Sequence, residues 1–163
     1  MPPVAQVRES INRSKIEAWR VSRVPVNPDE SIFQGDLLVW DVANRRATKG
    51  TAASAATFIG MSDTKNQVET AGSPSFLGDT KTSRVNVLQQ GLVEVIWGVS
   101  ETVYPFDEVI LDSVANNAQT CKKGSTNPVG IVDPSYGAAG TAITSGTLVK
   151  IWLRVPNAYR VHF

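Results

Sequence analysis

Short runs of apolar residues recur along the chain, each bounded by residues that favour turns. The clearest are LLVWDV, VEVIWGV, EVILDSV and LVKIWL, which begin at residues 37, 93, 108 and 148. They are rich in Val, Ile and Trp and are flanked by Gly, Asn, Asp or Pro, which is typical of β-strands. In the best helical candidate, residues 4–18, four apolar residues could share one face (Val4, Val7, Ile11 and Ala18), but Ser and Asn residues lower its helix propensity. The pattern therefore predicts an all-β protein.

Part of this pattern occurs twice in the chain. The stretch GDLLVWDVANRRA (35–47) is matched at one constant offset by FDEVILDSVANNA (106–118). Further along, FIGMSD (58–63) is matched by VGIVD (129–133). The matched pairs are Asp36 with Asp107, Leu38 with Val109, Val39 with Ile110, Trp40 with Leu111, Asp41 with Asp112, Ala47 with Ala118, Gly60 with Gly130 and Asp63 with Asp133. Each copy then reaches a glycine and a β-branched run, GLVEVIW and GTLVKIW, where two registers fit equally well. We interpret the repeat as an internal duplication of a small β unit.

Two small β units would each be marginal alone, and packing them together as a sandwich or barrel buries strand faces that otherwise stay wet. We expect the following organisation: an extended N-terminal arm (1–30), a first β unit (31–100), a second β unit (101–153) and a C-terminal tail (154–163). Residues 64–90 are rich in Thr, Ser and Gly and poor in large apolar residues. They are expected to form a surface loop or hairpin within the first unit.

The composition narrows the list of partners. The chain has 163 residues and a formal net charge of +1, so no strong field attracts nucleic acid or an anionic membrane. The N-terminus lacks the apolar stretch of a signal peptide, and no run approaches the length of a membrane span. The single cysteine, Cys121, excludes an intramolecular disulfide and fits a reducing compartment. We expect synthesis in the cytoplasm and neither a nucleic-acid nor a membrane partner.

No motif indicates catalysis, a cofactor or a metal site. His162 is the only histidine and the penultimate residue, which suits a catalytic triad poorly. Lys122 and Lys123 are neighbours that would favour the thiolate of Cys121, but the preferred interpretation is an inert thiol near a turn. The aspartates of each copy lie five residues apart, which places them on opposite faces of a strand, so we interpret them as turn residues. The glycine-rich stretch 137–146 lacks the residues of a phosphate loop and is expected to be a hairpin loop.

Both ends of the chain carry mixed aromatic and arginine residues. Trp40, Trp97 and Trp152 lie inside apolar runs and are assigned to the core, whereas Trp19 lies outside the repeat in a segment where Arg and Val alternate before two prolines. Such alternation predicts a segment that adds a strand to a sheet edge. Aromatic and arginine side chains are enriched at interface hot spots. The residues predicted to make contacts are Trp19, Arg20, Arg23, Tyr159, Arg160 and Phe163; frayed termini are the alternative.

The order GDLLVWD, FIGMSD and GLVEVIWGV, over roughly residues 31–100, resembles bacteriophage head decoration proteins, also called capsid cement proteins. The resemblance implies a non-enzymatic structural protein of the virion that binds the outer surface of the capsid and stabilises capsomer junctions. The implied partners are the major capsid protein and further copies of the chain itself, as a dimer or trimer. Deleting residues 1–25 is expected to leave a folded body that binds capsids more weakly.

Two other classes of function remain open. One is a carbohydrate-binding or host-attachment module of a phage particle, in which exposed aromatics among Trp19, Tyr104, Tyr136 and Tyr159 stack on sugar rings. The other is a hydrolase or isomerase in which the pseudo-symmetry brings Asp63 and Asp133 together. That enzyme requires the two carboxylates to converge in a cleft and one of their pKa values to be raised.

Overall fold

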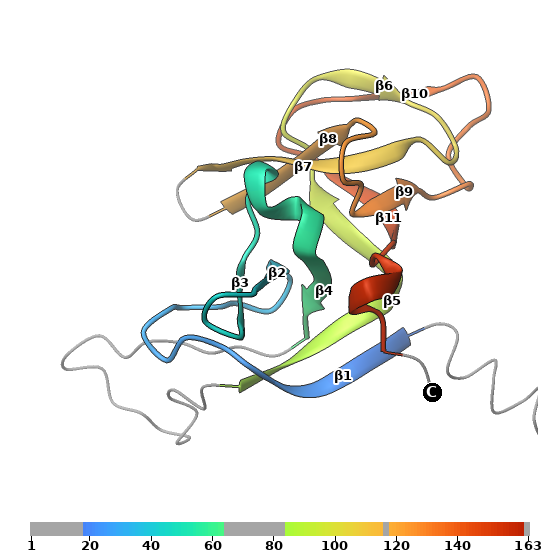
Figure 1. Ribbon diagram of the computed structural model, residues 1–163. Coiled ribbons are helices and arrows are strands. Elements are labelled where there is room, and N and C mark those ends of the chain that lie inside the picture. Colours follow the sequence, from blue (N-terminus) through green and yellow to red (C-terminus); the bar gives the residue numbers. More distant parts are fainter. Residues whose placement is uncertain (1–17, 64–83, 116–117, 162–163) are drawn as a thin grey trace, which may run out of the picture.

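The computed structural model describes residues 18–63, 84–115 and 118–161 (Figure 1). The described residues form eleven strands and two short 3-10 helices. The strands are β1 (Ala18–Pro25), β2 (Leu37–Asp41), β3 (Arg46–Lys49), β4 (Phe58–Ser62), β5 (Arg84–Ile96), β6 (Glu101–Val103), β7 (Glu108–Ala115), β8 (Ala118–Lys123), β9 (Gly130–Val132), β10 (Thr141–Ile143) and β11 (Leu148–Leu153); the helices are η1 (Ala52–Thr57) and η2 (Asn157–Tyr159). The all-β prediction is confirmed. The helical candidate 4–18 lies outside the described residues except for Ala18, which begins β1.

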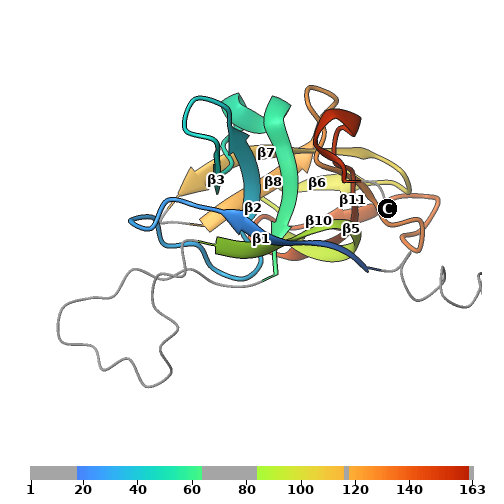
Figure 2. The same ribbon diagram turned by 60° about the horizontal axis from the view of Figure 1, so that its bottom comes forward.

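The strands form one curled antiparallel sheet and one small two-stranded sheet. The sheet order is β3-β2-β4-β5-β11-β9-β7-β8, β1 pairs with β5, and β6 pairs with β10 separately. Isolated bridges join Val26 to Ala47 and Trp97 to Cys121, so each end of the sheet curls back toward the long strand β5. Figures 1 and 2 show β5 running through the body, with β1 beside its first half.

The same pairing order occurs in both halves of the chain. β2 pairs with β3 and β4, and β7 pairs with β8 and β9. Leu38 faces Gly60 in the first half, and Val109 faces Gly130 in the second, which are the positions matched in the sequence. A common origin by duplication is a prediction that rests on this match.

Two parts of the sequence alignment are wrong. Trp40 faces Ala47 whereas Leu111 faces Cys121, so Cys121 and not Ala118 occupies the place of Ala47. A bulge beside Leu111 and a longer β8 account for the shift. The run GLVEVIW is not the counterpart of GTLVKIW, because it forms the second half of β5 and pairs directly with β11. The strand segment that lies beside β4, as β11 lies beside β9, is the first half of β5.

The predicted excursion 64–90 ends earlier than expected. Arg84 begins β5, and Val85 and Val87 are almost fully buried in the strand. The segment looked polar because Gln89 occupies the next inward position, where a third apolar residue would complete the alternation. Residues 64–83 lie outside the described part of the chain.

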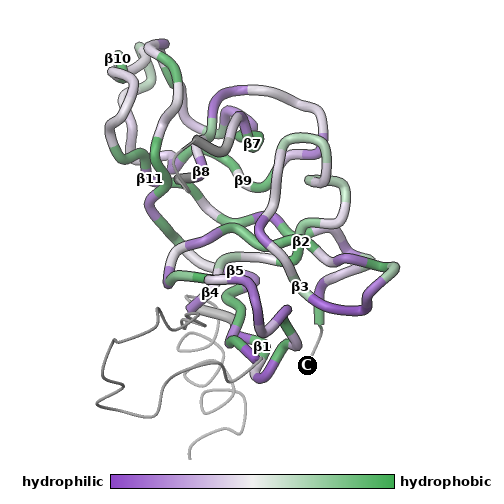
Figure 3. The backbone as a smooth tube through the Cα atoms, turned by 90° about the vertical axis from the view of Figure 1, so that its left-hand side faces the viewer, coloured by the Kyte–Doolittle hydropathy of each residue, from purple (hydrophilic) through white to green (hydrophobic). Residues whose placement is uncertain are grey.

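Alternate residues of the strands face two hydrophobic clusters. The smaller cluster lies within the first half, and the larger one lies mostly in the second half. β2 and β4 contribute to both, because Leu38 and Ile59 face the smaller cluster while Leu37 and Phe58 face the larger. The two halves therefore share buried surface through these strands. In Figure 3 hydrophobic and hydrophilic positions alternate along β1 in the same way.

The tryptophans predicted for the core differ in burial. Trp97 is fully buried in the larger cluster. Trp40 is half-buried against the smaller cluster. Trp152 is also half-buried, and its indole N–H donates to the Asp133 carboxylate at 2.8 Å. The core assignment is therefore confirmed for Trp97, holds in part for Trp40, and is wrong for Trp152, which lies at the edge of the core.

Two glutamines that the sequence analysis missed bind backbone groups from distant parts of the chain. The Gln119 side chain in β8 accepts from Leu37 N at 2.7 Å and donates to the carbonyl oxygens of Leu37 and Gly50, each at 2.8 Å. Buried Gln89 donates to the carbonyls of Ile59 and Tyr159 and accepts from Val161 N. Gln119 therefore joins the two halves, and Gln89 fixes the tail to the sheet.

Candidate functional site

The Cys121 thiol lies inside the body and is not a reactive site. It is 1 % exposed, and burial followed by the nearby Asp112 carboxylate raises its pKa to about 12. Activation by Lys122 would lower the pKa of the thiol, whereas its pKa is raised. The Lys122 ammonium lies 2.8 Å from the Asp112 carboxylate instead. This burial supports the interpretation of an inert thiol, although Cys121 lies within β8 opposite Leu111 and not at a turn.

We expect Cys121 in the native protein to resist a disulfide reagent at pH 8, because the thiolate is the reacting species and reaches solvent only on opening of the sheet. The measurement is the absorbance of the released thiolate with and without denaturant. One thiol per chain should react in denaturant. Reaction of the native protein at the rate of a free cysteine would contradict this account.

Three of the four repeat aspartates hold turns, as predicted, but the prediction is wrong for Asp112, which lies within β7 and forms an ion pair with Lys122. Asp41 accepts from Ala43 N and Asn44 N, and the Asn44 side chain followed by these amides lowers its pKa. Asp36 and Asp107 each accept from the backbone N–H three residues earlier, at 2.8 Å in both cases. In the described residues no group of three or more His, Cys, Asp or Glu side chains is arranged to hold a metal ion. His162 lies outside the described residues.

Asp63 and Asp133 are engaged separately. The Asp63 carboxylate forms an ion pair with Arg20, while Asp133 accepts from Ser135 and Trp152. The bond from Ser135 and then the bond from Trp152 lower the pKa of Asp133. A general acid in this position requires a raised pKa, so the geometry at Asp133 opposes the hydrolase hypothesis.

The lowered pKa of Asp133 also predicts a pH dependence. In the unfolded chain the carboxyl titrates near its ordinary value of about 3.9, so its contribution to stability is complete above that pH and is lost as the pH falls through the lower folded value. We expect Asp133→Asn to be less stable than the native protein at pH 7, with a difference that shrinks as the pH falls below the ordinary carboxyl value of about 3.9. Urea unfolding at each pH measures it. A difference that stays constant with pH would contradict the assignment.

The predicted contact residues of the N-terminal arm lie on the chain's own sheet. Residues 18–25 form β1, in which Trp19 pairs with Gln90 and Arg20 with Leu88 of β5. The Arg20 guanidinium forms an ion pair with Asp63. Arg23 lies in a bulge with a φ of +60°, and its backbone N–H donates to the Asn86 side chain. The predicted strand addition therefore takes place within the chain. Residues 1–17 of the arm are outside the described residues.

The C-terminal contact residues also pack on the body. Tyr159 is half-buried and contacts both hydrophobic clusters. Arg160 donates through Nη2 to the Val155 carbonyl at 3.2 Å. Phe163 lies outside the described residues. The described part of the tail is therefore attached to the sheet and does not extend as a free arm.

A more distinctive surface feature is a turn that occurs once before β2 and once before β7. In the first aromatic corner (Phe33, Gly35, Asp36 and Lys49), Phe33 N donates to the Asp36 carboxylate and Asp36 N donates to the Phe33 carbonyl at 3.1 Å. The Lys49 ammonium lies 3.3 Å from that carboxylate and 5.2 Å from the centre of the Phe33 ring. The Lys49 ammonium therefore makes a cation–π contact with the Phe33 ring, and Phe33 is 43 % exposed.

The second aromatic corner (Tyr104, Phe106, Asp107 and Lys123) has the same construction. Asp107 N donates to the Tyr104 carbonyl at 3.2 Å, and Lys123 lies 3.9 Å from the Asp107 carboxylate and 5.5 Å from the centre of the Tyr104 ring. Tyr104 is also 43 % exposed. Phe106 is the counterpart of Gly35: Phe106 N donates to the Val132 carbonyl, and Gly35 N to the Ser62 carbonyl.

Phe106 departs from what folding alone would favour. Its φ is +67°, a left-handed conformation in which Gly35 has +96° and a phenylalanine costs about 1 kcal/mol. The ring is nonetheless 63 % exposed, so little burial offsets that cost. An exposed aromatic residue on a strained backbone points to a contact surface. The signal in the sequence was the pair FQGD and YPFD, in which an aromatic precedes aspartate by three residues, before each first strand of the repeat.

Of the aromatic residues considered for sugar stacking, Tyr104 is the exposed one among the side chains that the structure describes. Tyr136 and Tyr159 are half-buried, and the Tyr136 hydroxyl accepts from Lys150 N at 3.0 Å. In the described part of the chain, no helix is long and apolar enough to cross a membrane. No family model matches the chain, and no curated protein is detectably similar to it in sequence.

Proposed function

We propose that this chain binds the outer surface of an assembled bacteriophage capsid as a decoration or cement protein. The observation that supports a bridging role is the pair of aromatic corners. The turn before β2 lies beside the lower end of β4, since Gly35 N donates to the Ser62 carbonyl, and Figure 1 shows the turn before β7 at the upper right, so the two corners lie on different parts of the body. A protein with two separated contact points is suited to joining neighbouring capsomers.

The energetics of a lattice support the same proposal. A packaged genome presses outward on the shell, and a protein bound to two capsomers at once opposes their separation. When one corner is bound, the other is held at a high effective concentration next to its site, so each contact needs only modest affinity. The partners in this proposal are the major capsid protein and sister copies in a dimer or trimer, and the location is the outer surface of the virion.

A second candidate is a carbohydrate-binding or host-attachment module. The observation that favours it is the exposure of two rings in one corner, Tyr104 and Phe106. Aromatic rings of this kind stack on the apolar faces of sugars. Binding of the isolated protein to a glycan array, without binding to shells, would select this candidate over the first.

Co-sedimentation with phage shells stripped of minor proteins tests the proposal, and Phe106→Gly sharpens it. Glycine fits the left-handed conformation, so the variant should fold while its affinity for shells falls about tenfold or more. Val42→Ser removes another exposed apolar side chain, in the β2–β3 turn, and should bind as the native protein does. Saturable binding of the native protein at a fixed ratio to the major shell protein is the expected result. If the native protein does not bind shells, the proposal is overturned. If Phe106→Gly binds as tightly as the native protein, the second corner has no role in the contact.

The deletion experiment has a boundary set by the structure. Removing residues 1–25 would take away β1 and expose one side of the first half of β5, which would then pair with β4 alone, so loss of binding would not separate a lost contact from a disturbed fold. Removing residues 1–17 leaves β1 in place. Full capsid binding after that deletion would exclude residues 1–17 from the contact.

A further inference from the structure

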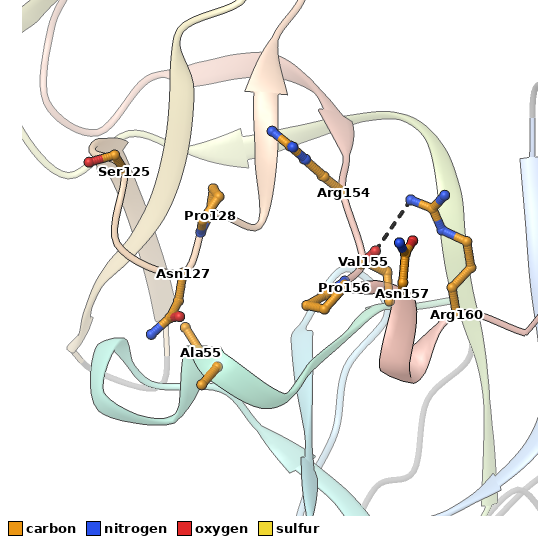
Figure 4. Close-up of a pocket in the computed structure, with 10 residues that line it drawn as sticks. Ala55, Ser125, Asn127, Pro128, Arg154, Val155, Pro156, Asn157 and Arg160 are labelled. Atoms are coloured by element: carbon orange, nitrogen blue, oxygen red, sulfur yellow. Dashed lines mark hydrogen bonds between the residues drawn. The ribbon is translucent and has the colours of Figure 1, made fainter.

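A polar pocket of about 520 Å³ lies between the two halves of the molecule (Figure 4). Its walls come from η1, from the loop around Asn127 and Pro128 between β8 and β9, and from the tail around Arg154 to Arg160. The volume is within the range of sites that hold small ligands or a few side chains. None of the corner residues lines it.

The pocket has a positive lining. Arg154 and Arg160 contribute guanidinium groups, and Ser125, Asn127 and Asn157 contribute neutral polar groups. Among the described residues that line the pocket, none is acidic. The Glu108 carboxylate approaches Arg154 only to 3.8 Å, and the side chains of Arg154 and Glu108 are 59 % and 42 % exposed. A pair this long and this exposed is weak, which leaves Arg154 free to bind another anion.

Arg160 is held in position with bonding capacity to spare. Its Nη2 donates to the Val155 carbonyl at 3.2 Å, which fixes the guanidinium beside the pocket as Figure 4 shows. Its Nε is buried and has no hydrogen-bond partner within the part of the chain that the structure describes. A buried guanidinium N–H without an acceptor is costly, and an incoming carboxylate or a small movement of the tail on binding would satisfy it.

We infer that this pocket binds a carboxylate carried by an acidic segment of a partner protein. A guanidinium presents paired donors that match the two oxygens of a carboxylate. Ala55, Pro128 and Pro156 add apolar wall, which the stem of a Glu side chain and a neighbouring residue can cover but a free inorganic anion cannot. The inference does not depend on the partner being a capsid, because it rests on the pocket alone.

The test is a titration of the full chain with a capped four-residue peptide that contains two glutamates, followed by backbone amide NMR. We expect saturable shifts at Ala55, Asn127 and Asn157, and binding about tenfold weaker for the same peptide with glutamines. Shifts that do not saturate, or equal binding of the glutamine peptide, would overturn the inference. Inorganic phosphate at equal ionic strength is the second arm, and binding of phosphate as tight as that of the peptide would identify a general anion site and overturn the choice of a protein segment.

Arg154→Gln is the main variant, because Arg160 also holds the tail and its replacement can disturb the fold. Arg154→Gln should weaken the glutamate peptide about tenfold and leave the amide spectrum of the remaining protein native-like. Lys150→Gln removes an equal charge from an exposed position on β11 and should change the affinity by less than about twofold. If Arg154→Gln and Lys150→Gln lose the same affinity for the peptide, net charge alone explains the binding and the pocket assignment is overturned.

Discussion

Gly60→Ala is expected to destabilise the protein by about 3 kcal/mol or more and to leave it largely unfolded at moderate temperature. A Cβ at this position would lie 2.2 Å from the Leu88 carbonyl oxygen and 2.8 Å from Val87 Cγ1, and the φ of +134° is one that alanine rarely adopts. The obstacle is backbone, so β4 has to move away from β5, which disturbs the faces that pack on both clusters. Urea unfolding followed by circular dichroism measures the change.

Two other glycines make a graded control. Gly130 occupies the equivalent place in the second half, and a Cβ there would lie 2.6 Å from the Trp152 carbonyl oxygen without a left-handed φ, so Gly130→Ala should cost less than Gly60→Ala. Gly137 is exposed, and the nearest atom to its Cβ would be Thr141 Oγ1 at 4.0 Å, so Gly137→Ala should change stability by less than about 0.5 kcal/mol. Equal losses at Gly60 and Gly137 would show that the close approach of the strands is not what requires glycine.

Trp97→Ala is expected to cost about 3–5 kcal/mol, the range for truncating a buried aromatic side chain. Trp97 is fully buried in the larger cluster, and its indole N–H donates at 2.9 Å to Glu101, which also accepts from Lys123 N. The change therefore opens a cavity and removes one donor from a half-buried carboxylate. The free energy of unfolding in urea is the measurement.

The control for Trp97 comes from the strand that ends immediately before it, β5. Leu92 lies in β5, but its side chain is 44 % exposed, so Leu92→Ala should cost less than about 1 kcal/mol. Trp97→Phe keeps part of the volume and loses the hydrogen bond, and it should fall between the two. A smaller loss for Trp97→Ala than for Leu92→Ala would contradict the assignment of the core.

The sequence predicted the strands well where side chains face one core. LLVWDV, EVILDSV and LVKIWL became β2, β7 and β11, because Val, Ile and Trp in short alternating runs suit a half-buried strand. It failed where a polar residue occupies an inward position. The polar residue Gln89 interrupted the apolar alternation, so the first half of β5 was not recognised as a strand. Gln89 can be buried because its amide donates to the carbonyl groups of Ile59 and Tyr159, which lie far away in the sequence.

The candidate contact surface was harder to predict than the fold. The contacts predicted for aromatic and arginine residues near the termini stay a prediction; the structure shows β1 and the described part of the tail packed on the sheet, with Arg20 ion-paired to Asp63. The exposed aromatic corners depend on turn geometry. Only the backbone shows that Phe106 is left-handed, and only the fold brings Lys123 beneath the Tyr104 ring.

The most direct test of the central proposal is electron cryo-microscopy of stripped phage shells saturated with this protein. We predict additional density on the outside of the shell at junctions between capsomers, with the corners at Phe33 and at Phe106 each meeting a different capsomer. Density on the inner surface, density that touches a single capsomer through another face, or no density at saturating concentration would contradict the proposal.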